Sequence, residues 1–170
     1  MKLERVTGPR QIAAVAELAR DIWTAYYTPL IGAAQVGYML AAFQSEEAIT
    51  RQISAADHEY YLAPGVGYLA LVPEPAQQRM LVSKIYVKDD RRRTGIGRAM
   101  IALAEERCRA TGCRELWLTV NRHNTASIAF YEKMGFHKTN EQVTDIGGGF
   151  VMDDCRMAKT IPPARANPTE

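Results

Sequence analysis

The pattern of apolar and polar positions predicts mainly helices in the first third of the chain. A short alternating segment at 2–6 reads as a strand, and apolar residues then recur at helical spacing over 11–26. These residues are Ile12, Val15, Leu18, Ala19 and Ile22. We expect Pro29 to end this helix, because proline has no amide hydrogen for the next helical bond. Two more helices are predicted, one over 35–43 and one over about 45–56.

Three strands are predicted in the middle of the chain. Residues 59–72 are rich in Tyr, Leu and Val and read as two strands joined by a turn at Pro64-Gly65. After a second turn at 73–78, the apolar run 81–87 reads as a third strand. Consecutive strands joined by short turns favour an antiparallel meander.

The last part of the chain alternates between helices and strands. The predicted elements are a helix from 96 to the stop at Thr111-Gly112, a strand at 116–120, a helix at 124–134 closed by Gly135, and strands at 136–143 and 150–157. The apolar face of the first helix is marked by Ile96, Ala99, Met100 and Leu103. We expect the three glycines at 147–149 to form a flexible turn.

The order strand, helix, strand is that of a parallel crossover. We therefore expect an α/β (α+β) fold with a mixed sheet of six to seven strands, antiparallel in its N-terminal part and with a parallel central pair, flanked by about four to five helices. A chain of 170 residues, 47% of them hydrophobic, suits one domain, which we place at 1–160. Residues 161–170 contain three prolines and are expected to be a disordered tail.

Composition and charge argue against several classes of protein. The net charge of +2 is almost balanced, so we expect neither a nucleic-acid nor a membrane partner. The three cysteines form no Cys-x-x-Cys pair and have no histidine at zinc spacing, so no metal site is expected. The first residues hold no apolar signal segment, and no apolar run reaches the roughly 18 residues of a membrane helix. We expect a cytoplasmic protein. The sequence leaves open whether the protein forms a homodimer.

The loop after the strand at 81–87 predicts an anion site. It reads Arg92-Arg93-Thr94-Gly95-Ile96-Gly97 and leads directly into a helix. Its glycines permit positive φ and a close approach to the backbone, while the first-turn amides of the helix have no acceptor within the helix. With Arg91 and Arg98 nearby, the positive potential suits a phosphate or a pyrophosphate.

Two other phosphate motifs fit this loop less well. The chain has no Gly-x-x-x-x-Gly-Lys-Ser/Thr string, which argues against a P-loop. A dinucleotide fingerprint needs a small residue three positions after Gly97, where Met100 stands instead. The alternative that the arginines at 91–93 form a solvated charge run beside an ordinary turn stays open.

Two motifs, in this order, resemble the signatures of the GNAT superfamily of N-acetyltransferases. Residues 87–97 end in Arg-x-x-Gly-x-Gly before a helix, as in that superfamily's acetyl-CoA signature. Residues 116–136, LWLTVNRHNTASIAFYEKMGF, have the strand, the Asn-x-x-(small)-x-x-x-Tyr spacing and the Gly-Phe of its second signature. The resemblance implies the GNAT fold and an enzyme that moves an acetyl group from acetyl-CoA to a primary amine by direct attack in a ternary complex.

The resemblance also implies which residues contact the donor. They are Ile85, Tyr86, Val87, Arg92, Arg93, Thr94, Gly95, Ile96, Gly97, Arg98, Asn124, Ser127 and Tyr131. The strand end at 85–87 would pair with the pantetheine arm, and amides near Tyr86 and Val87 could hold the developing oxyanion. Tyr131 matches the tyrosine that protonates the leaving thiolate. The alternative for Tyr131 is a buried aromatic that only fixes its helix to the sheet.

No residue stands out as the base that removes the proton of the amine. The histidine candidates are His58, His123 and His137. Carboxylates could both attract a cationic amine and accept its proton, if the early helices cover the site. These candidates are Glu46, Glu47, Asp153 and Asp154. Tyr27 is a further candidate on the acceptor side.

A finer resemblance concerns the acceptor. Residues 26–48 and 143–157 are similar to a bacterial branch of the superfamily associated with polyamine acetylation. Asp153 and Asp154 would suit a polycation such as spermidine or spermine. Two alternatives stay open: an N-acetyltransferase acting on a terminal amine or lysine of a protein or peptide, and a non-catalytic domain that binds acyl-CoA.

Overall fold

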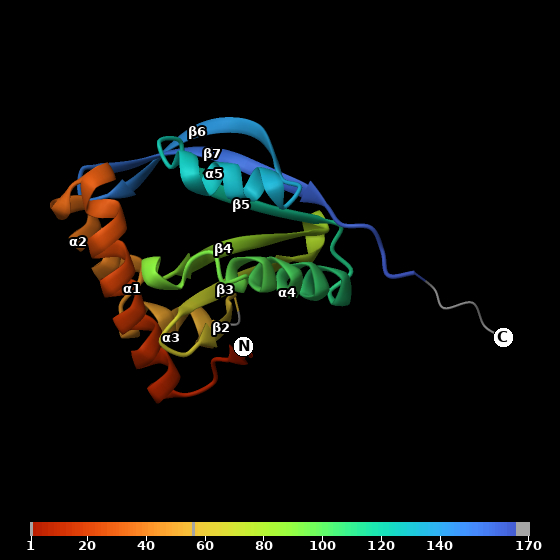
Figure 1. The fold of residues 1–170 in the computed structure, drawn as a ribbon, viewed down its shortest axis with the longest axis horizontal. Helices are drawn as coiled ribbons and strands as arrows, with labels where there is room; N and C mark the ends of the chain where they lie inside the picture. Colours follow the sequence, from red (N-terminus) through yellow and green to blue (C-terminus); the bar gives the residue numbers. More distant parts are fainter. Residues whose placement is uncertain (1, 56, 166–170) are drawn as a thin grey trace.

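The computed structural model describes residues 2–55 and 57–165, which form a seven-stranded mixed sheet with five α-helices packed against it (Figure 1). The strands are β1 (Glu4–Arg5), β2 (Glu59–Ala63), β3 (Gly67–Glu74), β4 (Arg79–Val87), β5 (Glu115–Asn121), β6 (His137–Gly147) and β7 (Phe150–Thr160). The helices are α1 (Pro9–Ile31), α2 (Ala33–Phe43), α3 (Glu46–Ser54), α4 (Ile96–Ala110) and α5 (Thr125–Lys133). Short 3₁₀ turns lie at Pro75–Gln77 and Asp89–Arg91.

The sheet has the order β1-β2-β3-β4-β5-β7-β6. Its first four strands are antiparallel neighbours, β4 and β5 run parallel, and the last strands are antiparallel again. The predicted fold class, with an antiparallel meander followed by a parallel pair, is therefore confirmed. The long helix α4 supplies the parallel crossover between β4 and β5.

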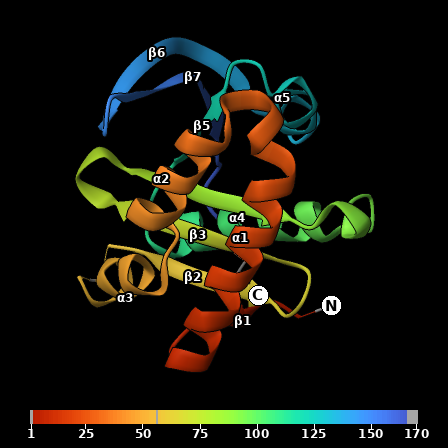
Figure 2. The same ribbon diagram turned by 90° about the vertical axis from the view of Figure 1, so that its left-hand side faces the viewer.

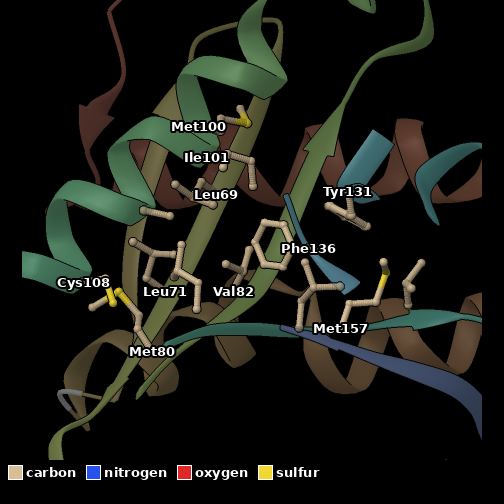
Figure 3. Close-up of a cluster of buried hydrophobic side chains, with 14 of the residues drawn as sticks. Leu69, Leu71, Met80, Val82, Met100, Ile101, Cys108, Tyr131, Phe136 and Met157 are labelled. Carbon is tan, nitrogen blue, oxygen red and sulfur yellow. The ribbon is translucent and has the colours of Figure 1, made fainter. Parts of the chain in front are cut away.

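Helices cover both faces of the sheet, so β3 is buried on both sides. Tyr68 and Ala70 of β3 pack with α1 and α2, whereas Leu69 and Leu71 pack with α4. Figure 3 shows Met100 and Ile101 of α4 above the strands, with Tyr131 and Phe136 at the α5 end of the same cluster. Figure 2 looks onto the other side, where α1, α2 and α3 lie in front of the strands. This two-sided packing fixes β3, the antiparallel neighbour of β4 in the sheet.

The core-facing side of α4 differs from the prediction at two positions. The buried residues of this helix are Ile96, Met100, Ile101, Ala104 and Cys108. Ala99 is exposed and Leu103 is only partly buried, because the stripe that faces the sheet runs through Ile101 and Ala104 instead.

The sequence predicts that Pro29 ends α1, but the helix continues past this residue. The helix continues to Ile31 and stops at Gly32, whose amide donates to the carbonyl of Thr28 at 2.9 Å and whose φ is +87°. A proline in the last turn removes only one helical hydrogen bond, so the helix tolerates it there. About one further helical turn, residues 27–31, is thereby kept on α1 beyond the predicted span.

The glycine turn at 147–149 lies against α2. The hydroxyl of Tyr38 donates to the carbonyl of Ile146 at 2.7 Å, and a Cβ on Gly148 would lie 2.8 Å from the Tyr38 ring. Gln35 of α2 also donates to the carbonyl of Val151 at 2.8 Å. The tip of the β6–β7 hairpin is thus fastened to α2, where we had expected a flexible turn.

The end of the chain is attached beyond the predicted domain boundary. Ile161, which we had placed in the disordered tail, is 1% exposed, and its amide donates to the carbonyl of Arg114 at 2.8 Å. Arg109 donates to the carbonyl of Pro162 at 3.3 Å. Residues 166–170 of the predicted tail, and the predicted helix end at residue 56, lie outside the described residues.

A buried lysine fastens α2 and α3 to the sheet. Lys84 of β4 donates to the carbonyl of Phe43 at 2.5 Å and to Gln52 Oε1 at 2.9 Å, and it also contacts the hydroxyl of Tyr60. Phe43 is the last residue of α2, so the amine of Lys84 lies at the negative end of this helix, and burial lowers the pKa of that amine to about 7. These hydrogen bonds hold α2 and α3 in place over their face of the sheet.

In the described part of the chain, no helix is long and apolar enough to cross a membrane.

Candidate functional site

The site begins where β4 and β5 separate. Their parallel ladder comprises only three residue pairs, from Arg79 with Glu115 to Leu81 with Trp117. Beyond it, residues 82–87 of β4 continue without β5, and residues 118–121 of β5 pair only with β7. Figure 1 shows the two strands close at one end and diverging toward α1 and α2. The free edge of β4 therefore faces an opening in the sheet.

A cavity of about 720 Å³ occupies this opening. One side is lined by the strand end at 85–87, the first turn of α4 and the helix α5. The other side is lined by α1, α2 and β7. Because the opening passes between the two strands, a group bound against α4 can reach the side covered by α1.

The turn before α4 presents backbone amides to this cavity. Ala99 donates the first intrahelical bond to the carbonyl of Gly95 at 3.0 Å, so the amides of residues 96–98 precede it and have no acceptor in the helix. Gly95 has φ +88° and Arg93 has φ +62°. The side chains of Arg92, Arg93 and Arg98 line the cavity at this end. Amides and arginines together suit a pyrophosphate.

Gly97 serves a different purpose from the one predicted. It lies inside α4 with no positive φ, and a Cβ there would approach Phe130 Cζ of α5 to 3.1 Å. Glycine at this position therefore allows α4 and α5 to approach each other at the cavity wall, whereas Gly95 provides the left-handed turn.

The β4 edge offers a second set of backbone donors. Lys88 donates its amide to the carbonyl of Val66 at 2.9 Å, which places that amide on the β3 side of the strand. Because backbone groups alternate along a strand, the amide of Val87 points to the opposite edge, toward the opening. The amide of Val87 can therefore donate to a group that lies in the opening.

Arg92 connects the anion turn to α1 and α5. Its guanidinium lies 4.4 Å from the centre of the Tyr26 ring, and the hydroxyl of Tyr26 donates to Asn124 Oδ1 at 2.6 Å. Asn124 is the N-cap of α5, since its Oδ1 also accepts from the amide of Ser127 at 3.2 Å. Asn124 thus holds α5 against α1 while it lines the cavity.

Tyr131 lines the cavity from α5 and is 8% exposed. Its ring packs edge-on against Phe130 and Phe136 at centroid distances of 5.4 and 5.9 Å. Burial raises the pKa of the Tyr131 phenol above its usual value of about 10. The group therefore keeps its proton at neutral pH, in the form that a general acid requires.

The α1 side of the cavity is aromatic. The rings of Trp23 and Tyr27 stack at 4.4 Å, and the ring of Tyr86 meets Trp23 edge-on at 5.3 Å and Tyr27 at 6.1 Å. Burial, followed by the neighbouring Tyr26, raises the pKa of Tyr27 to about 12. Neutral aromatic surface therefore makes up much of the wall around the opening.

Asp154 of β7 is the cavity-lining carboxylate in the described part of the chain. It is 4% exposed and lies opposite Asn121 in the β5–β7 ladder, four residues past the last β4–β5 pair. Burial, followed by the adjacent Asp153, raises the pKa of Asp154 to about 6. The carboxyl group can therefore change its protonation state near neutral pH.

Several predicted residues lie outside the cavity lining. Thr94 turns back and donates to the carbonyl of Arg91 at 2.7 Å. Glu46 and Glu47 are exposed on α3, where Glu47 pairs with Arg51 at 3.0 Å. Asp153 points to the opposite face of β7 from Asp154, since side chains alternate along a strand, and pairs with Arg122 at 2.8 Å. The histidines His58, His123 and His137 do not line the cavity either.

Sequence reasoning missed most of the wall supplied by α1, α2 and β7. The missed residues include Trp23, Tyr26, Ile31, Met39 and Met152. The spacing of Trp23, Tyr26 and Tyr27 on one helix was visible in the sequence, but which partner they face depends on how α1 crosses the sheet. The remaining predicted residues, including Tyr27, Asn124 and Ser127, all line the one cavity.

Known proteins resemble this chain in sequence. The Acetyltransferase (GNAT) family matches residues 16–136. A streptothricin acetyltransferase of Streptomyces lavendulae is 32% identical over 93 residues, which are 55% of this chain and 48% of that protein. The ribosomal protein bS18-alanine N-acetyltransferase of Escherichia coli is 39% identical over 54 residues, 32% of this chain and 36% of that protein. The chain thus spans about half or less of the length of these relatives.

Solved structures share the fold. The paiA N-acetyltransferase of Thermoplasma acidophilum, solved in complex with coenzyme A, has a TM-score of 0.72 with 21% identity. The match covers 94% of this chain and 99% of that one. At this level of identity, the likeness concerns the architecture alone.

Proposed function

The chain belongs to the acetyltransferase (GNAT) family, and from this premise we propose that it transfers the acetyl group of acetyl-CoA to a primary amine. The observation that carries the proposal is one cavity through the split sheet. It has a helix start with unpaired amides and arginines at one side and a buried carboxylate, Asp154, at the other. A donor and an acceptor could therefore meet at the free edge of β4.

The donor would be held by backbone and arginine groups. The free amides of residues 96–98, with Arg92 and Arg93, suit its pyrophosphate. The unpaired edge of β4 suits the amide groups of its pantetheine arm, in the manner of an added strand. When bound, acetyl-CoA supplies an activated thioester, and the amide of Val87 would stabilise negative charge on its carbonyl oxygen.

Tyr131 would give its proton to the leaving thiolate. It lines the cavity from the α5 side and is a phenol at neutral pH, and burial raises its pKa further. Asn124 would contribute by fixing the start of α5, the helix that carries Tyr131.

Two classes of acceptor have support from separate observations. The resemblance of residues 26–48 and 143–157 to a polyamine-acetylating branch of the superfamily points to a polyamine, for which Tyr27 and Asp154 would form the binding groups. The relation to an alanine N-acetyltransferase over 54 residues favours the terminal amine of a peptide. Both classes present a primary amine to the same cavity.

Thiol release from acetyl-CoA tests the proposal. The purified protein is incubated with acetyl-CoA and single amines, including spermidine, a peptide with a free N-terminal alanine and simple alkylamines. We expect release of free coenzyme A and an acetylated product of matching mass for at least one amine. Binding of acetyl-CoA with no transfer to any amine would instead show a non-catalytic acyl-CoA-binding domain.

A further inference from the structure

The acceptor side of the cavity is mainly apolar. Its lining combines the stacked Trp23 and Tyr27 with the aliphatic side chains of α1, α2 and β7. These aliphatic residues are Ile22, Ile31, Met39 and Met152. The hydroxyl of Tyr26 donates to Asn124 Oδ1, and the side-chain amide of Gln35 donates to the carbonyl of Val151. The body of an acceptor would therefore meet carbon surface.

Charge in the lining is strongly unbalanced. Among the described residues, Asp154 supplies the one carboxylate that lines the cavity. The cationic lining residues are Arg92, Arg93, Arg98 and Lys133. The other acidic residues that could have paired with a second positive charge lie outside the lining. They are Glu46, Glu47 and Asp153.

We propose that the acceptor is a primary amine with a single positive charge on an apolar or aromatic body, and that Asp154 binds its ammonium group and accepts its proton. This inference rests on the proposed acetyl transfer. The aromatic rings of Trp23, Tyr27 and Tyr86 would surround the carbon next to the nitrogen.

A polycation fits this pocket less well. Each additional ammonium group brought into the cavity would lose its hydration without a carboxylate partner, and would face the basic side chains at the other end. If those extra charges stayed in solvent, they would gain nothing from the pocket. Spermidine should therefore have no advantage over a monoamine.

The transfer balances with the groups present. The ammonium proton moves to Asp154 and from there to solvent, and the nitrogen lone pair forms a C–N bond with the acetyl carbon. The C–S bond of the thioester breaks, its electron pair leaves on sulfur as a thiolate, and the nitrogen loses its second proton to solvent to give the neutral amide. Tyr131 gives its proton to that thiolate and is reprotonated from solvent.

A comparison of amines tests the inference. We expect kcat/KM for 2-phenylethylamine to exceed that for spermidine, and for a peptide with N-terminal alanine, by roughly tenfold or more. Asp154→Asn should lower kcat/KM for 2-phenylethylamine by roughly 10²- to 10⁴-fold with an unchanged Kd for acetyl-CoA. Glu141→Gln removes an exposed carboxylate on the neighbouring strand β6 and should leave both constants unchanged.

The pH profile provides a readout that a structural role would not change. The groups that interact with Asp154 are Asp153 on β7, Thr119 on β5, Tyr27 on α1 and Tyr86 on β4. Burial keeps both phenols protonated. Wild-type kcat/KM should therefore fall below about pH 6, where Asp154 takes up a proton, and Asp154→Asn should lose this acidic limb.

The outcomes separate the inference from the proposed function. Preferred turnover of spermidine or of the peptide, or an Asp154→Asn enzyme with wild-type rates, overturns the inference and leaves acetyl transfer in place. If no amine in the comparison releases thiol, acetyl transfer itself fails and the inference fails with it.

Discussion

At the scale of single residues, the cavity controls protonation by burial. Tyr131 and Asp154 come from different elements, yet burial raises the pKa of both. The phenol is protonated at neutral pH even at its ordinary pKa of about 10, so its proton is available for donation with or without the shift. For the carboxyl group, it brings the change of charge close to neutral pH, where proton uptake from an amine and release to solvent can both occur.

Tyr131→Phe tests the acid role. We expect kcat to fall by roughly 10²- to 10⁴-fold, with little change in the Kd for acetyl-CoA, because only the hydroxyl is removed and the ring packing on Phe130 and Phe136 is kept. Steady-state rates and calorimetric binding measure the two effects. Tyr131 acts only as a packing residue if kcat is unchanged.

Asp154→Asn should stabilise the protein at neutral pH. Folding raises the pKa of the Asp154 carboxyl from 3.8 to about 6. The protonated carboxyl therefore stabilises the folded state in full below pH 3.8, and this stabilisation is lost as the pH rises through about 6. At pH 7.5 the buried charge therefore costs up to about 3 kcal/mol, which the neutral amide avoids. Urea unfolding at pH 7.5 should show a gain of roughly 1 to 3 kcal/mol that nearly vanishes at pH 4. An equal loss at both pH values would mean that the carboxylate makes a stabilising contact.

At the scale of elements, local pattern predicted the helices and strands but not what they face. Helical spacing placed Ile12 and Ile22 on the buried side of α1. The same reasoning could not place Tyr26 against Asn124, because these residues are 98 positions apart and meet only when α1 crosses the sheet. Glu46 and Glu47 sit at the start of α3 as expected, yet that helix start lies away from the cavity.

The candidate donor site was more predictable than the acceptor site for a physical reason. The candidate anion turn offers backbone amides of contiguous residues, 96–98, so its chemistry can be read from one short segment. The acceptor wall combines side chains of α1, α2 and β7, and its composition depends on strand alternation. Asp153 and Asp154 are neighbours in sequence, but only Asp154 faces the cavity.

The contact between α2 and the β6–β7 hairpin should control the acceptor end of the cavity. Gly148 has φ +62° and a Cβ there would lie 2.8 Å from the Tyr38 ring, whereas Gly149 has φ +79° with nothing within 4 Å. Both alanine variants bear the strain of positive φ, but only Gly148→Ala displaces Tyr38. We expect a rise of roughly threefold or more in the acceptor KM for Gly148→Ala relative to Gly149→Ala, with equal Kd values for acetyl-CoA. Equal acceptor KM values in the two variants would exclude this role for the hairpin contact.

At the scale of the whole molecule, the sheet consists of two parts with a narrow junction. The strands β1 to β4 form one part and β5, β7 and β6 the other, and they are joined through three residue pairs. The cavity lies beside this junction and is lined from both parts, by Val87 and Arg92 on one side and by Asn124 and Tyr131 on the other. A ligand that contacts both parts should therefore raise the stability of the entire fold.

Bound acetyl-CoA should therefore raise the stability of the folded protein, and thermal unfolding can measure this rise. At 100 times its Kd, a ligand that binds only the folded state adds about 2.7 kcal/mol, which for a chain of this length corresponds to a rise in Tm of roughly 5 to 10 °C. Arg92→Ala should lose much of this shift at a fixed ligand concentration, because Arg92 lines the cavity at the anion turn. Arg91→Ala provides the matched control, since Arg91 lies outside the lining and is more than half exposed. Equal losses for both variants would mean that the turn attracts the ligand by general charge alone, and no shift in the wild type would contradict the assignment of the cavity to acetyl-CoA.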